Sequence, residues 1–175
     1  MKMHRVLSLP ALVVAGALCW APPPGAWAQT VTQSLTDPTT GSTVQTVTSA
    51  TVTVSGTVSG EPESVSLSGK AKIESRVVWS EISTATAVPA AITLDIDLSG
   101  ISGTGKSTRA KYVTNAREIA LRRLSATDLV DIAFPFYVSG TGGFPSARTG
   151  LARFSLSYDV NTGALKSVSG SLTSP

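Results

Sequence analysis

The stretch SVSLSGKAKIESRVVW, residues 64–79, decides the fold class because its apolar and polar side chains alternate almost without a break. The apolar positions of one parity are Val65, Leu67, Ala71, Ile73, Val77 and Trp79. Side chains of a β-strand point alternately to its two faces, so this pattern predicts an antiparallel strand with one buried and one solvated face. A straight strand of this length would be longer than a domain of this size is wide, and we expect a bulge at Gly69.

The same alternation recurs along the rest of the chain. It covers residues 50–58, 92–98, 130–138 and 152–160, and a turn at 159–163 leads into a returning strand at 164–172. The last two of these segments should form a hairpin. Together the pattern predicts an all-β fold: a single antiparallel β-sandwich, or a partly open barrel, of about seven to eight strands over residues 50–175.

Residues 115–124 fit two structures. Asn115 could cap a short helix in which Glu118 and Arg122 lie four residues apart. Alternatively, Ile119 and Leu121 could share one side of a strand. Predicted strands on both sides of this segment favour the strand.

Pro135 stands in the middle of the strand predicted at residues 130–138. Because proline has no backbone N–H to donate to a ladder, this strand should lie at a sheet edge or carry a bulge there. An open edge can recruit a partner strand, and a proline on that edge can also block such pairing. We favour the blocking role.

The N-terminal residues have the composition of a secretory signal peptide. A short positive stretch at 2–5 precedes an apolar run at 6–20 and a Pro/Gly segment at 22–25. Ala26 and Ala28 then supply small residues at the two positions that a signal peptidase reads, before the expected cleavage site between Ala28 and Gln29. The apolar run is shorter than the ~20 residues that a membrane-spanning helix needs. We therefore expect residues 1–28 to be removed and the protein to be periplasmic or secreted.

The remaining alternative for the N-terminus is a lipid anchor on Cys19. We disfavour it because Leu18, and not a small residue, precedes this cysteine. After cleavage the mature chain begins with a Ser/Thr-rich leader at residues 29–49, which has room for one strand. We expect no transmembrane segment in this mature chain.

Cleavage would change the chemistry available to the chain. Loss of Lys2 and Arg5 leaves 12 of the 14 basic residues against 11 acidic ones, a net charge of +1, so no basic patch suggests nucleic acid. The mature chain would contain no Cys, His or Met. Without Cys and His it could not assemble a Ser-His-Asp or Cys-His nucleophile, and zinc, copper and haem sites would lose their usual ligands. We therefore expect no cofactor, and we expect that the protein is not an enzyme.

The segment GISGTGKS, residues 100–107, matches the P-loop pattern letter for letter through Gly100, Gly105, Lys106 and Ser107. A true P-loop continues into a helix, whereas residues 108–114 alternate like a strand. Nucleoside triphosphates are also not expected in the compartment to which we assign the protein. We interpret the match as chance in a Gly/Ser/Thr-rich chain.

Three residues are weak ligand candidates. Asp95 and Asp97 lie on the polar face of one predicted strand, where paired carboxylates could serve glycoside hydrolysis or bind calcium, although a solvated or ion-paired face is the more common outcome. Arg148 lies in a Gly-rich loop at residues 139–150 that could be mobile. Asp159 begins a calcium-loop-like sequence that lacks the later ligands, so we assign no metal site.

These observations lead to two functional hypotheses. The first is an exported, non-catalytic β-protein that acts by binding or assembly, with an envelope protein, a glycan or other copies of itself as partner. In one version, residues 30–48 of a neighbouring copy complete an incomplete sheet. The alternative is a carbohydrate-binding or glycan-hydrolysing protein that uses Asp95 and Asp97.

Overall fold

The computed structural model describes residues 26–27, 29–35, 43–79, 89–140 and 146–175, and these residues contain strands and turns and no helix. The strands are β1 Ala26–Trp27, β2 Gln29–Leu35, β3 Thr43–Val58, β4 Val65–Trp79, β5 Pro89–Gly105, β6 Lys111–Val113, β7 Arg117–Arg123, β8 Thr127–Val138, β9 Arg148–Tyr158 and β10 Leu165–Thr173. Among the residues described, no helix is long and apolar enough to cross a membrane. The predicted all-β fold is confirmed.

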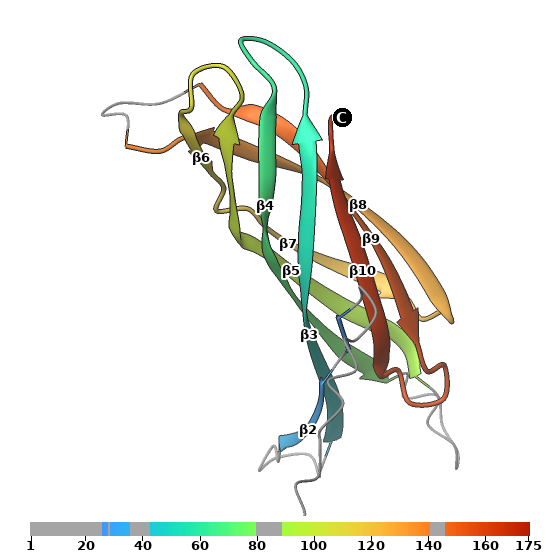
Figure 1. The fold of residues 1–175 in the computed structure, drawn as a ribbon. Helices are drawn as coiled ribbons and strands as arrows, with labels where there is room; N and C mark the ends of the chain where they lie inside the picture. The colour runs from blue at the N-terminus through green and yellow to red at the C-terminus, as the bar shows by residue number, and fades with distance from the viewer. Residues whose placement is uncertain (1–25, 28, 36–42, 80–88, 141–145) are drawn as a thin grey trace, which may run out of the picture.

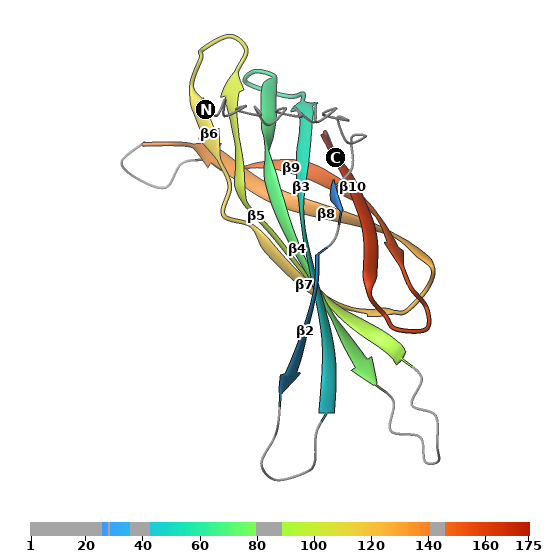
Figure 2. The ribbon, with the colours of Figure 1, turned by 60° about the horizontal axis from the view of Figure 1, so that its bottom comes forward.

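Seven of the strands close into a barrel (Figure 1). The order is β3-β4-β5-β6-β8-β9-β10, with antiparallel neighbours throughout, and a parallel bridge between Leu172 of β10 and Gly56 of β3 closes the ring. Strand β2 pairs with the first part of β3, and β7 pairs with β5 beyond the end of β6. In Figure 2 the ends of β3, β4 and β5 nearest to β2 extend away from the wall formed by β8, β9 and β10.

Alternating side chains fill the inside of the barrel. The largest fully buried ones include Phe134, Phe136 and Phe154, which are 0% exposed. On β4 the inner residues Val65, Leu67 and Ile73 are buried, while the outer face of that strand carries lysines, Glu74 and an arginine. This is the arrangement of a small barrel whose core consists of side chains.

Several local predictions are confirmed. Residues 64–79 form β4, and its register against β5 shifts between Lys70 and Lys72, next to Gly69, where we expected the bulge. Strands β9 and β10 form the predicted hairpin. Residues 117–123 form a strand, so the helical alternative for this segment is wrong.

The N-terminal predictions are met by the structure only in part. Residues 1–25 and 28 lie outside the described residues, so the signal peptide and its cleavage site stay predictions. Within the predicted leader, Gln29–Leu35 pairs with Thr43–Ser49 of the same chain. The leader therefore contributes β2 and the beginning of β3, and its strand pairing is made within one copy.

Candidate functional site

Glu63 lies at the centre of a hydrogen-bond network that sequence reasoning did not find. Its side chain is 6% exposed and accepts hydrogen bonds from the backbone N–H of Ser107 at 2.8 Å and of Thr108 at 2.9 Å. The hydroxyls of Thr108 and Tyr112 also donate to it. These hydrogen bonds lower the pKa of Glu63 to about 2, and the bond from the Thr108 hydroxyl contributes most to this change.

The P-loop-like segment therefore binds an anion of the same chain, the carboxylate of Glu63. Gly100 lies within β5, Gly105 ends this strand, and Lys106 and Ser107 are exposed in the turn that precedes β6. A Cβ at position 105 would lie 2.2 Å from a Glu63 carboxylate oxygen, so any larger residue there would have to displace the carboxylate from its hydrogen bonds. The backbone N–H groups that would cradle phosphate in a P-loop bind Glu63 in this fold.

Arg148 fixes the neighbouring loop in place. Its guanidinium donates to the carbonyl oxygens of Glu63 at 2.7 Å and Gly60 at 3.2 Å, and it lies over the ring of Phe136 at 5.3 Å. These contacts are a charge-assisted and cation–π anchor for the loop between β3 and β4. The structure thus gives this ligand candidate an internal role.

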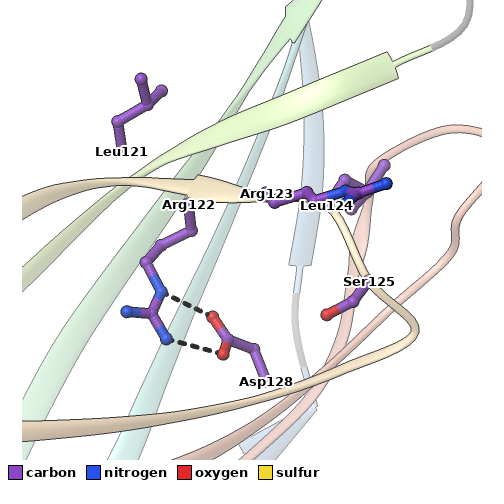
Figure 3. A pocket seen from close by; sticks show the side chains of 6 residues that line it. All are labelled: Leu121, Arg122, Arg123, Leu124, Ser125 and Asp128. Carbon is purple, nitrogen blue, oxygen red and sulfur yellow. Dashed lines mark hydrogen bonds and ion pairs between the residues drawn. The ribbon is translucent and has the colours of Figure 1, made fainter.

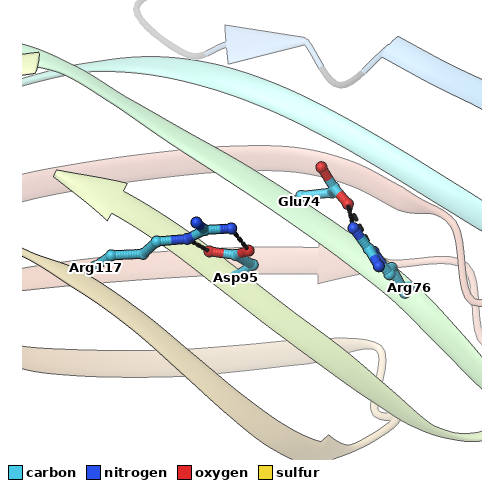
Figure 4. A network of polar contacts seen from close by, with 4 residues as sticks. All are labelled: Glu74, Arg76, Asp95 and Arg117. Carbon is cyan, nitrogen blue, oxygen red and sulfur yellow. Dashed lines mark hydrogen bonds and ion pairs between the residues drawn. The ribbon is translucent and has the colours of Figure 1, made fainter. Parts of the chain in front are cut away.

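Asp95 and Asp97 lie on the outer face of β5 and both accept hydrogen bonds, and Figure 4 shows the contact of Asp95 with Arg117. Arg117 of β7 binds both carboxylate oxygens of Asp95, one of them through Nε at 2.8 Å, and this hydrogen bonding lowers the pKa of Asp95. Asp97 accepts a bond from the backbone N–H of Ser99 at 2.8 Å, and hydrogen bonds from Ser99 lower its pKa as well. Within the residues that the structure describes, no group of three or more acidic, His or Cys side chains is placed to hold a metal ion.

The most unusual surface is strand β7. Ile119 is 62% exposed and Leu121 is 70% exposed, and the side chains of the opposite parity are also exposed or only half-buried. β7 pairs with β5 on one edge, and in the described chain no backbone ladder joins its other edge to β8. β7 is thus an edge strand that carries two large apolar side chains in solvent, a combination that soluble proteins generally avoid.

Strand β8 has the matching open edge. It pairs along its length with β9, but on its other side it pairs with β6 only at Tyr137 and Val138. The carbonyl of Pro135 accepts a bond from the Thr114 hydroxyl at 2.6 Å on this side. Since N and O of a strand residue point the same way, Pro135 lacks its N–H on the side of β8 where no ladder is formed at this residue. β8 itself is not an edge strand, because it lies between β9 and β6 in the sheet.

An ion pair bridges the two edges near the turn between β7 and β8 (Figure 3). Arg122 donates to both oxygens of Asp128, at 2.9 and 2.8 Å, and to the carbonyl of Leu129 at 3.2 Å. An open pocket of about 640 Å³ lies here, lined by Leu121, Arg122, Arg123, Leu124, Ser125 and Asp128. The ion pair holds β7 beside β8 without a ladder.

Replacing Asp128 with asparagine should lower the free energy of unfolding by about 1 kcal/mol, because the bidentate pair is partly exposed and solvent screens it. Urea unfolding at neutral pH measures this change. The matched control is Asp131→Asn, which removes a more exposed pair with Arg153 and should cost less. Equal losses would show that Asp128 has no special role in bridging the edges.

The sequence pattern indicated β7 as a strand, but it did not indicate that this strand has an open edge. Ile119 and Leu121 were correctly predicted to share one side of the strand, but alternation cannot tell an outward face from an inward one. Comparison of the chain with protein families, curated proteins and solved structures finds no match.

Proposed function

We propose that the protein is an exported, non-catalytic β-barrel that binds another protein chain by accepting a strand at its β7 edge. The observation that carries this proposal is the open edge of β7, with Ile119 and Leu121 exposed beside it. Strand addition to such an edge gives affinity through backbone hydrogen bonds and specificity through alternate side chains. Export rests on the composition of residues 1–28.

The chemistry of the rest of the barrel supports binding over catalysis. The interior is filled by buried apolar side chains. Arg117 engages both oxygens of Asp95, and Glu63 is engaged by the loop that follows β5. The glycan-directed alternative rests on Asp95 and Asp97 alone, and the hydrogen bonds of these two residues with Arg117 and Ser99 do not favour it.

A photo-crosslinking amino acid at position 121 should capture a partner chain in cells that produce the protein. Leu121 lies beside the open edge, so a strand bound there would pass within reach of the probe. The matched control places the same amino acid at Thr51, an exposed position on the outer face of β3. Adducts at both positions, or at neither, would contradict the proposal.

The adduct at position 121 should also disappear in the Ile119→Pro variant. Proline at this position removes a backbone donor from the edge and blocks strand addition. An adduct that survives this change would show that the partner binds the surface without pairing to the strand.

A further inference from the structure

The direction of the backbone groups in β7 follows from two hydrogen bonds at its ends. The N–H of Leu98 donates to the carbonyl of Ala116 at 2.9 Å, and the N–H of Leu124 donates to that of Ala90 at 3.3 Å. Both pairs continue the antiparallel register of β5 with β7. Because alternate residues of a strand bond to one neighbour, the even-numbered residues of β7 bond β5. The odd-numbered ones direct their N–H and C=O to the open edge: Arg117, Ile119, Leu121 and Arg123.

The sequence of β7, REIALRR, complements itself when it is reversed about Ala120. In an antiparallel pair centred there, Ile119 faces Leu121 of the second copy, and Glu118 faces Arg122 of the second copy. Odd-numbered residues then oppose odd-numbered residues, as the open edge requires for hydrogen bonding. Glu118 and Arg122 meet at the closer, non-hydrogen-bonded positions, where opposite charges attract most strongly.

Glu118 and Arg122 both have polar side-chain atoms available for these contacts. Glu118 makes no hydrogen bond or ion pair with the described residues, and Nη1 of Arg122 has no partner among them, since Nε and Nη2 make the bonds to Asp128 and Leu129. The register does place Arg117 opposite Arg123 of the second copy. Arg117 is already neutralised by Asp95, which reduces the repulsion.

Neighbouring registers lose this complementarity. A shift that keeps odd residues opposed moves Glu118 opposite Ala120 or Leu124 of the second copy, and it sets Leu121 against Arg117 or against itself. Such a shift therefore loses the contacts between Glu118 and Arg122. The register centred on Ala120 keeps both these ion pairs and the contacts between Ile119 and Leu121.

We propose that the strand accepted at the β7 edge is β7 of a second copy, antiparallel about a two-fold axis at Ala120. This inference rests on the proposed function and names its partner. An isologous contact of this kind uses the same edge of both copies, so it closes a dimer and does not propagate a fibre. The seven-residue strand is short, and we therefore expect a dimer that dissociates on dilution.

The register is tested by disulfide trapping in the full chain carrying Cys19→Ser, which removes the only native cysteine. Ala120→Cys should give a disulfide-linked dimer under mild oxidation, since the two Cα atoms at a non-hydrogen-bonded pair are separated by about 4.5 Å. Glu118→Cys is the matched control, because position 118 faces position 122 of the second copy. Trapping at 118 that equals or exceeds trapping at 120 would overturn the proposed register.

Sedimentation over a range of concentrations tests the edge itself. Ile119→Pro removes an edge-facing N–H without touching a bond to β5, and it should weaken dimerisation at least tenfold. Leu121→Lys should do the same if proline disturbs the strand, whereas Thr51→Lys, at an exposed position on the outer face of β3, should leave the dimer intact. Equal effects of the two lysine variants would place the interface elsewhere.

The outcome separates this inference from the function on which it rests. A chain that stays monomeric, with no trapping at 120 but an adduct to a different protein at position 121, would overturn the dimer and leave strand addition standing. Failure of the position-121 crosslink together with a monomeric chain would overturn both.

Discussion

Replacing Glu63 with glutamine should lower the urea concentration at which the protein unfolds, by several times the change caused by Glu61→Gln. The carboxylate accepts four hydrogen bonds: one from Ser107, two from Thr108 and one from Tyr112. The side-chain amide of glutamine would place its own N–H groups against some of these donors. Hydrogen bonds to a charged acceptor are among the strong ones, and buried donors left without a partner are costly. Glu61 is exposed in the same loop and is the matched control.

The effect of Glu63→Gln should also depend on pH. The folded-state pKa of Glu63 is about 2, against an ordinary value of 4.5, so its carboxylate stabilises the fold fully above about pH 4.5. This contribution is lost as the pH falls through the folded-state value. The difference in unfolding free energy between wild type and variant should therefore shrink as the pH falls from about 5 to about 2. Parallel pH profiles would show that the ionised carboxylate is not what holds the loop.

Glu63 illustrates what the sequence could not reveal. Its sequence neighbours suggest only a turn, and its partners lie 44 to 49 residues further along the chain. The P-loop-like segment was visible as an anion-binding pattern, but the sequence alone does not indicate which anion is brought to it. Only the pairing of β4 with β5, and of β5 with β6, places Glu63 against Ser107 and Thr108.

The strands themselves were predictable because their signal is local. The alternation in residues 64–79 predicts which side chains are buried, and Val65, Leu67 and Ile73 are buried in the structure as expected. The closure of the sheet was not predictable in the same way. It depends on a contact between Gly56 and Leu172, whose separation along the chain leaves no periodic signal.

Replacing Gly56 with alanine should cost about 3 kcal/mol of unfolding free energy or more. A Cβ at this position would lie 1.8 Å from the carbonyl oxygen of Leu172 and 2.6 Å from its carbonyl carbon, so β3 and β10 would have to separate where the barrel closes. Backbone atoms cannot give way as a flexible side chain does, which puts this overpacking at or above the upper end of the usual range. Urea unfolding at neutral pH measures the loss.

The matched control is Ser55→Ala, which changes the adjacent, exposed residue of the same strand and should be nearly neutral. Separation of β3 from β10 would also expose two further strand edges, so Gly56→Ala should increase aggregation, measured by light scattering below the unfolding transition. A variant as stable and as soluble as Ser55→Ala would mean that the barrel does not close through these two residues. The unpaired edge of β7 would then be one of several open edges, because the β3 and β10 edges would compete with it for any strand that the protein accepts.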